Sequence, residues 1–161
     1  MTGTARAYYR SPIGMIEIVA AGEGITALNF VSQEPAGAVP EHPILKAAVS
    51  EVDEYFGGAR SEFTVPLSTP GTDFQRQVWG RLIRIPYGQT ATYSGLARAV
   101  GRPRAVRAVG QANHRNPVSI IIPCHRVIGS DGRLTGYGGG LWRKEWLLAH
   151  ERKHANRLPV L

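Results

Sequence analysis

The segment IIIPCHRV, residues 120–127, constrains the fold more than any other part of the chain. The apolar run from 118 to 122 predicts a short strand in the protein interior. Pro123 has no N–H group to donate to a sheet, so we expect it to end that strand and turn the chain. The only cysteine, Cys124, follows directly and precedes a histidine and an arginine.

A thiol beside an imidazole and a guanidinium lies in a field that favours the thiolate, the form that attacks electrophiles. A lone cysteine after three isoleucines is otherwise most often a small buried apolar residue. The features farther along the chain favour the reactive interpretation. A single cysteine also excludes an intramolecular disulfide and any zinc site with two thiolates.

Length and hydropathy limit the class of protein. The 161 residues suffice for one domain or two small ones. No segment approaches the roughly 20 apolar residues that span a bilayer, and the first ten residues lack the apolar part of a secretory signal. We therefore expect a cytoplasmic protein that does not bind membranes.

The two halves of the chain differ in charge. Residues 1–70 contain four Lys or Arg and eight Asp or Glu, whereas residues 71–161 contain fifteen and four. Sixteen of the nineteen basic residues are Arg, which suits forked contacts to phosphate and stacking on bases. The second half thus predicts a polyanionic partner, although a basic surface could also serve solubility or bind an acidic protein.

The first part of the chain predicts a small αβ unit. Residues 5–30 contain β-prone segments separated by Gly-containing turns. Apolar residues at helical spacing predict a helix over 43–56, which the pair Gly57-Gly58 ends. This part shows no catalytic cluster, and we interpret it as a supporting domain.

The second part predicts a helix-turn-helix. Thr72 and Gln75 form a capping-box pattern ahead of one helix. Thr92 is placed to cap a short helix that Gly101 closes, and Pro103 is placed in the first turn of the next helix, which runs to about His114. Two short helices joined by a tight turn are typical of this motif.

The second helix of this motif has one polar, basic side and several small residues. A basic stripe is often only a solvated face, but this one lies in the positively charged half of the chain. The stripe consists of Arg104, Arg107, Gln111 and either His114 or Arg115. The small residues, which allow close approach to a groove, are Ala105, Ala108 and Gly110.

Downstream of the cysteine, Tyr137 precedes three glycines. Such a run lets the backbone approach a flat ligand, so it predicts a base pocket walled by Tyr137 or, alternatively, a flexible loop. A helix is predicted from Leu141 to His150, with Trp142 and Trp146 expected in the core. It ends at Glu151, a carboxylate beside an apolar helix end.

The motif PCHRV at 123–127 resembles the O6-alkylguanine-DNA alkyltransferase family, together with RAVG at 107–110, Asn116-Pro117 and YGGG at 137–140. The matching motifs are colinear and cover about residues 72–151. The resemblance implies an α+β fold. A ribonuclease H-like domain over 1–70 would precede a mainly helical, winged-helix or helix-turn-helix catalytic domain over 71–161.

The resemblance also implies the chemistry. Cys124 would take the alkyl group from O6 of guanine, and also from O4 of thymine, in a single irreversible turnover. His125 would act as a base through a water, Glu151 would orient His125, and Asn116 would fix the turn that carries the thiol. The damaged base is itself the alkyl donor, so no cofactor is expected.

The partner implied is double-stranded DNA containing O6-alkylguanine, bound through the minor groove by a monomer. The nucleotide would rotate out of the duplex. Arg107 would fill the gap that the nucleotide leaves in the base stack. Tyr93 would crowd the rotating phosphate and form a hydrogen bond with the flipped base. Tyr137 would wall the pocket, and the N–H of Gly138 would donate to O6. The remaining residues assigned to the DNA surface are Arg104, Ala105, Ala108, Gly110 and Gln111, and those assigned to the pocket are Val127 and Ser119.

Several members of that family bind a structural zinc through N-terminal Cys and His residues. With one cysteine this chain departs from that pattern, and we expect no metal.

Three alternatives and two further departures remain open from the sequence. A non-enzymatic lesion binder, a helix-turn-helix regulator with a redox-sensing thiol, and a cysteine hydrolase each account for part of the pattern. Gly138 stands where other family members carry Ser, and Ser119 where some carry Pro. Both positions border the pocket, so the size of alkyl group accepted is left open.

Overall fold

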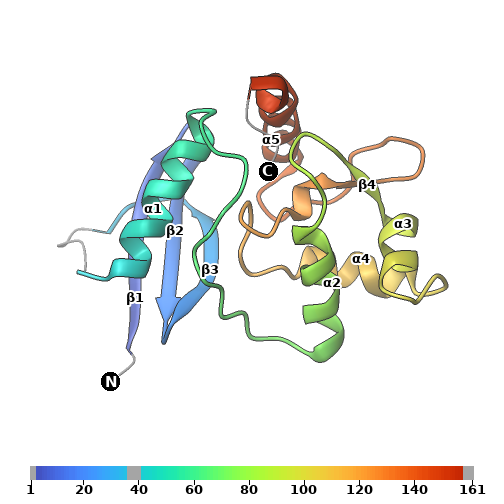
Figure 1. Cartoon of the computed structure of the whole chain (residues 1–161), viewed down its shortest axis with the longest axis horizontal. Coiled ribbons are helices and arrows are strands. Elements are labelled where there is room, and N and C mark those ends of the chain that lie inside the picture. Colours follow the sequence, from blue (N-terminus) through green and yellow to red (C-terminus); the bar gives the residue numbers. More distant parts are fainter. Residues whose placement is uncertain (1–2, 36–40, 158–161) are drawn as a thin grey trace.

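The computed structural model describes residues 3–35 and 41–157 and has an α+β architecture, as predicted. A three-stranded sheet with one helix precedes a group of helices (Figure 1). The helices and strands are β1 (Thr4–Ser11), β2 (Gly14–Ala21), β3 (Gly24–Val31), α1 (Pro43–Phe56), α2 (Asp73–Ile83), β4 (Ala91–Thr92), α3 (Tyr93–Ala99), α4 (Val106–His114), β5 (Val127–Ile128) and α5 (Leu141–His154). Short 3-10 turns cover Cys124–Arg126 and Ala155–Arg157.

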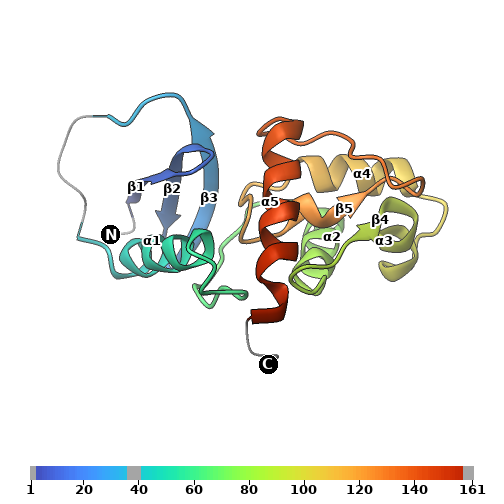
Figure 2. The same cartoon turned by 90° about the horizontal axis from the view of Figure 1, so that it is seen from above.

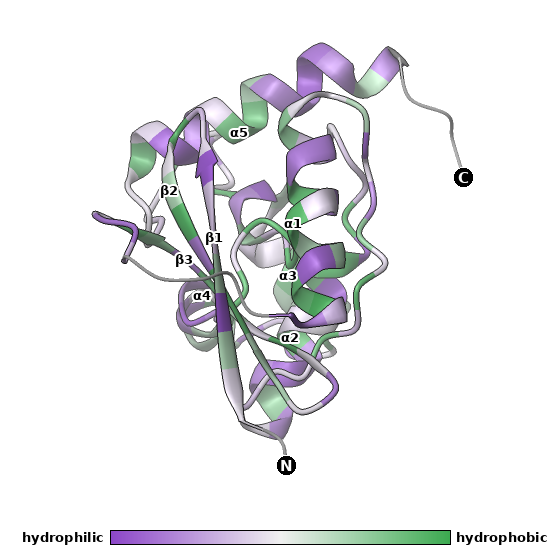
Figure 3. Ribbon diagram, turned by 90° about the vertical axis from the view of Figure 1, so that its left-hand side faces the viewer, coloured by the Kyte–Doolittle hydropathy of each residue, from purple (hydrophilic) through white to green (hydrophobic). Residues whose placement is uncertain are grey.

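The sheet is an antiparallel meander in the order β1-β2-β3, and α1 packs on one face of it. Alternate residues of β2 point to that face, and Ile16, Ile18 and Ala20 are fully buried. Figure 3 shows hydrophobic and hydrophilic residues alternating along the strands and along α1. The bounds of α1 agree with the prediction, since the apolar spacing and the glycines after Phe56 both mark them.

The outer edge of β3 joins the sheet to the second part of the chain (Figure 2). The N–H of Leu28 donates to Pro117 O at 2.9 Å, and Leu28 forms a parallel bridge with Val118. The edge that a three-stranded sheet would leave unpaired therefore binds the loop that leads to the cysteine.

The predicted helix-turn-helix is formed by α3 and α4. Thr72 makes the predicted capping box at α2, Thr92 caps α3, and Gly101 follows α3 with φ +77°. The start of α4 at Val106 is later than predicted. Pro103 is the second residue of a turn instead, in which the N–H of Ala105 donates to Arg102 O at 2.9 Å, and proline is equally favoured there.

The apolar run 118–122 is buried as predicted, but the predicted strand is wrong. The run folds into a tight loop in which Ser119 bridges to Ile122 and Ile120 has a positive φ of 74°. The N–H of Ile122 donates to Val118 O at 2.9 Å, so the loop satisfies part of its own backbone without a neighbouring strand.

The last helix, α5, continues to His154, beyond the predicted end at His150. Trp146 packs on Phe56 of α1 with ring centroids 5.7 Å apart. Trp142 is 56% exposed, so its predicted place in the core is wrong. The buried face of α5 carries Lys144, Leu147, Leu148 and Glu151.

The predicted domain boundary at residue 70 falls in a segment, 57–72, without helix or strand. The division into domains 1–70 and 71–161 stays a prediction, and residues 1–2 and 158–161 of these ranges lie outside the described part. Among the described residues, no helix has the length and apolar character needed to cross a membrane.

Candidate active site

The single cysteine begins the 3-10 turn that follows the buried loop, and its side chain is buried. Asn116 braces this loop at both ends. Its Nδ2 donates to Ile122 O at 2.7 Å, and its Oδ1 accepts from the N–H of Val118 at 2.9 Å. The two hydrogen bonds fix the backbone that positions Cys124, which is the place expected for Asn116.

The carboxylate of Glu151, on the buried side of α5, forms hydrogen bonds with four residues. His125 Nε2 lies 2.7 Å from Oε2. Arg126 approaches both oxygens, with Nε 2.8 Å from Oε1 and Nη2 3.0 Å from Oε2. Tyr55 of α1 donates its hydroxyl to Oε2 at 2.6 Å, and the N–H of Gly88 donates to Oε1 at 3.4 Å. We call these five residues the Glu151 network.

The network sets the charge of its members. Burial raises the pKa of Glu151, but the contacts with His125 and Arg126 outweigh it and hold that pKa well below its usual range. Burial lowers the pKa of His125 more than the Glu151 carboxylate raises it. The result is an ionised Glu151–Arg126 pair beside a neutral imidazole.

The tautomer of His125 follows from this geometry. Its Nε2 faces the carboxylate and therefore carries the hydrogen. Its Nδ1 is buried and has no hydrogen-bond partner among the described residues. A neutral imidazole with an unpaired, lone-pair-bearing nitrogen is prepared to accept a proton.

The thiol of Cys124 is protonated at rest. Burial raises its pKa, while Asn116 and the charge of Lys144 oppose the increase. The expectation that the neighbouring imidazole and guanidinium favour the thiolate is wrong, because both side chains point to Glu151.

Lys144 is a site residue that the sequence interpretation missed. Its side chain is fully buried, its Nζ donates to Thr135 O at 2.7 Å, and it lies 6.0 Å from the centre of the Tyr93 ring. No carboxylate of the described residues pairs with it, and burial lowers its pKa to about 8. The seven-residue spacing between Lys144 and Glu151 on one helix was the signal available in the sequence.

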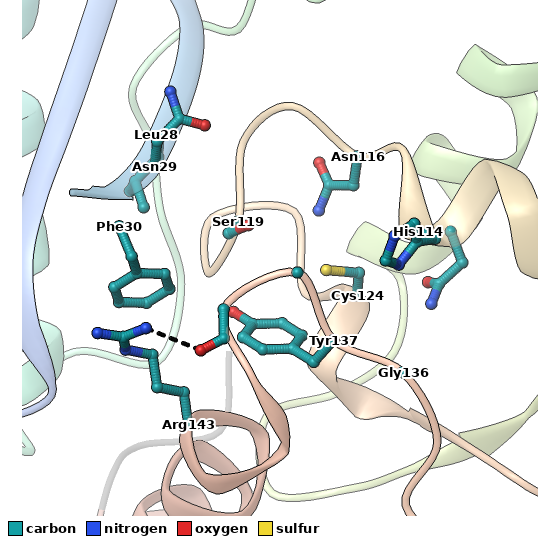
Figure 4. Close-up of a pocket in the computed structure, with 13 residues that line it drawn as sticks. Leu28, Asn29, Phe30, His114, Asn116, Ser119, Cys124, Gly136, Tyr137 and Arg143 are labelled. Carbon is teal, nitrogen blue, oxygen red and sulfur yellow. Dashed lines mark hydrogen bonds between the residues drawn. The ribbon is translucent and has the colours of Figure 1, made fainter. Parts of the chain in front are cut away.

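A cavity of about 240 Å³ opens beside the thiol (Figure 4). This is slightly below the roughly 300–1,000 Å³ of drug-sized sites, which suits one planar heterocycle. It is lined by Leu28, Asn29, Phe30, Asn113, His114, Asn116, Ser119, Cys124, Gly136, Tyr137, Gly138, Gly139 and Arg143.

Of the residues assigned to the pocket, Tyr137, Gly138 and Ser119 line this cavity, whereas Val127 is buried behind it. The hydroxyl of Tyr137 is buried without a hydrogen-bond partner among the described residues. The lining residues from β3 were not anticipated, because nothing in the local sequence shows that this strand edge meets the cysteine loop.

The polar side of α4 faces solvent. On α4, Arg107, Ala108 and Gln111 are exposed, whereas Val109 and Ala112 are buried. Arg104, in the turn before the helix, is exposed, and Ala105, the N-cap residue, is half-buried. Gly110 faces Tyr93, since a Cβ at Gly110 would lie 3.7 Å from the tyrosine ring. The hydroxyl of Tyr93 accepts a hydrogen bond from Thr135 Oγ1 at 3.0 Å, which joins the helix-turn-helix to the glycine-rich loop.

Two family models match the chain. One is the 6-O-methylguanine DNA methyltransferase ribonuclease-like domain, over residues 5–69, and the other is the DNA binding domain of the same family, over residues 73–153. The first match agrees with the predicted ribonuclease-like character of the N-terminal part.

Relatives match over most of their length. A methylated-DNA–protein-cysteine methyltransferase of Mycobacterium leprae is 50% identical over 146 residues, 88% of each chain. The crystal structure of Mycobacterium tuberculosis O6-methylguanine methyltransferase superposes with a TM-score of 0.84 at 42% identity, covering 94% of each chain. A crystal structure of Mycobacterium tuberculosis OGT in complex with DNA gives 0.82 at 44% identity, covering 91% and 92%.

Acid should destabilise the protein through its buried neutral histidines. Burial lowers the pKa of His125 and also of His150, whose Nε2 lies 2.8 Å from Tyr55 O. The unfolded chain binds protons at these residues near pH 6.5 and the folded chain resists doing so, so stability is lost as pH falls. We expect the free energy of unfolding to fall below pH 6.5 by up to about 1.4 kcal/mol per pH unit for each histidine. Urea denaturation at pH 7.5, 6.5 and 5.5 measures this, and equal values at the three pH values would contradict it.

Proposed function

Since the chain belongs to the 6-O-methylguanine DNA methyltransferase family, we propose that it repairs DNA by transferring an alkyl group from O6 of guanine to Cys124. Transfer from methylated DNA to a cysteine of the protein itself is the activity of its curated relatives. The chain has one cysteine, and this cysteine borders the cavity. The observation that carries the proposal is the neutral His125 next to that thiol, held by Glu151 and with no partner for its Nδ1 in the described part of the chain.

The transfer proceeds by nucleophilic displacement. The thiol proton passes through one water to Nδ1 of His125, and Glu151 stabilises the imidazolium that forms. The thiolate sulfur then bonds to the carbon attached to O6, and the C–O6 bond breaks with its electron pair left on the guanine. The buried cation of Lys144 stabilises the thiolate, since Cys124 and Lys144 affect each other's pKa. The thioether is stable, so each molecule acts once.

Burial of the thiol requires that the target nucleotide leave the duplex. The side chain of Cys124 is only 7% exposed, so O6 of a stacked guanine does not reach it. Arg107, on the exposed side of α4, fills the gap that the nucleotide leaves in the base stack. Tyr93 repels the rotating phosphate by steric contact and forms a hydrogen bond with the flipped base. Tyr137 walls the pocket, and the N–H of Gly138 donates to O6.

The exposed side of α4 binds the minor groove. The relative in complex with DNA supports DNA as the partner. Ala105, Ala108 and Gly110 allow close approach, with Arg104 and Gln111 contacting the DNA beside them. Minor-groove binding reads sequence poorly, which suits a protein that must accept a lesion in any context. The proposal further includes transfer from O4 of thymine, action as a monomer, and a cytoplasmic location.

A redox-sensing role fits the thiol less well. Sensor cysteines have a low pKa and are accessible to solvent. Cys124 is buried, and burial raises its pKa.

Replacement of the nucleophile separates transfer from binding. Cys124→Ser should abolish alkyl transfer from a duplex with one O6-methylguanine, because the hydroxyl is not activated by this base. Affinity for the same duplex, measured by fluorescence anisotropy, should stay within about threefold of the unaltered protein, a difference of less than 1 kcal/mol. Loss of binding in a folded variant would instead assign the thiol a structural role.

Replacement of Arg107 tests nucleotide flipping. Arg107→Ala should slow transfer from duplex DNA by about tenfold or more, because the cost of unstacking is no longer compensated. The rate with the free base O6-benzylguanine, which needs no flipping, should stay unchanged. Arg104→Ala serves as the control: it removes a charge from the same surface and should weaken binding, but at saturating duplex its transfer rate should equal that of the unaltered protein. Equal slowing of duplex and free base by Arg107→Ala would argue against its role.

A further inference from the structure

The cavity beside Cys124 continues past the thiol to the N-terminal sheet. In Figure 4, His114 lies on one side of Cys124, and Phe30 and Arg143 lie on the other. His114 ends α4, the helix that carries the exposed basic stripe. Phe30 and Arg143 therefore line the end of the cavity that lies beyond the thiol, as seen from α4.

The guanidinium of Arg143 is fixed at that far end. Its Nε donates to Ile13 O at 2.7 Å, and its Nη1 donates to Gly139 O at 2.8 Å. Its central carbon also lies 4.4 Å from the centre of the Phe30 ring and 4.6 Å from the centre of the Trp142 ring. Such contacts hold the cation in one orientation.

The charge of Arg143 has no counterpart in the cavity. Among the lining residues, Arg143 is the only Lys, Arg, Asp or Glu. Within the described part of the chain, Arg143 forms no ion pair. Its Nη1 is the terminal nitrogen on the cavity side, whereas Nη2 packs against Gly14, where a Cβ would lie 2.8 Å from it. The next cation along α5, Lys144, is likewise without a carboxylate there. A preorganised guanidinium in a partly dry site binds a carboxylate strongly.

We propose that this end of the cavity makes the protein favour O6 substituents that carry a carboxylate, and that Arg143 is the residue that determines this specificity. The proposal rests on the alkyl transfer proposed above. The chemistry is the same: sulfur bonds to the carbon attached to O6, and the C–O6 bond breaks with its electron pair left on the guanine. The thiol proton passes to His125, and Cys124 retains the carboxyl-bearing group as a thioether.

The test compares isosteric charged and neutral lesions. Three duplexes of one sequence carry O6-carboxymethylguanine, its neutral amide O6-carbamoylmethylguanine, or O6-methylguanine. Single-turnover rates are measured for the unaltered protein, Arg143→Gln, Arg143→Lys and the control Arg152→Gln, which removes an exposed charge from the same helix. A second pair, O6-(3-carboxypropyl)guanine and its amide, gives the carboxylate a longer reach.

The expected result concerns the ratio of the carboxylate rate to the amide rate. This ratio should fall on the order of tenfold in Arg143→Gln, in at least one of the two pairs, and should be partly retained in Arg143→Lys. It should be unchanged in Arg152→Gln. The intrinsic reactivities of the two substituents and their repulsion by DNA phosphates are the same for every protein tested. They therefore do not affect the change in the ratio from the unaltered protein to a variant.

An unchanged ratio in Arg143→Gln for both pairs overturns the proposal. A second measurement uses only the unaltered protein, so misfolding of a variant cannot affect it. The rate of Cys124 alkylation by iodoacetate is divided by the rate with iodoacetamide, and this ratio should exceed the same ratio for a cysteine-containing peptide. A ratio at or below that of the peptide also overturns it. Failure of the unaltered protein with O6-methylguanine is a separate result, which rejects the alkyl transfer itself.

Discussion

The buried carboxylate of Glu151 is the interaction on which the rest of the structure depends. It is fully buried, and an ionised carboxylate without partners at such a position would be very costly. Its partners come from α1, from the segment before β4 and from the 3-10 turn after the cysteine loop. Arg126 adds a bond from its Nη1 to Ile85 O at 2.7 Å, so both charges of the pair are satisfied. Elements from both parts of the chain are therefore held together at the candidate site by contacts to this one carboxylate.

The burial of the Glu151 network determines which of the reactive groups carry a proton. The positive charge of Arg126 compensates the negative charge of Glu151 beside His125. Burial then keeps the imidazole neutral and the thiol protonated. In the transfer proposed above, the thiolate is therefore generated from the thiol, with His125 as the base. The N-terminal sheet takes part as well, because β3 braces the cysteine loop and supplies one wall of the cavity. Its interpretation as a support alone was too narrow.

The sequence predicted the local features and missed those set by tertiary contacts. The bounds of α1, the capping box at Thr72 and the cap at Thr92 follow from local hydrogen bonds and apolar spacing. The run 118–122 was correctly predicted to be buried, but burial alone does not distinguish a strand from a tight loop. The partner Tyr55 lies 96 residues from Glu151, and Lys144 is a charged residue in a buried position. Tyr55 has no signal in the neighbouring sequence, and for Lys144 the only signal is its seven-residue spacing from Glu151 on one helix.

Intact-protein mass spectrometry after incubation with a duplex containing one O6-methylguanine, followed by peptide mapping, tests the central claim most directly. Alkyl transfer to Cys124 predicts a gain of one methylene mass, located on the peptide that holds this cysteine and saturating at one per molecule. An unchanged mass despite binding of the duplex would contradict the account and leave a protein that recognises the lesion without repairing it.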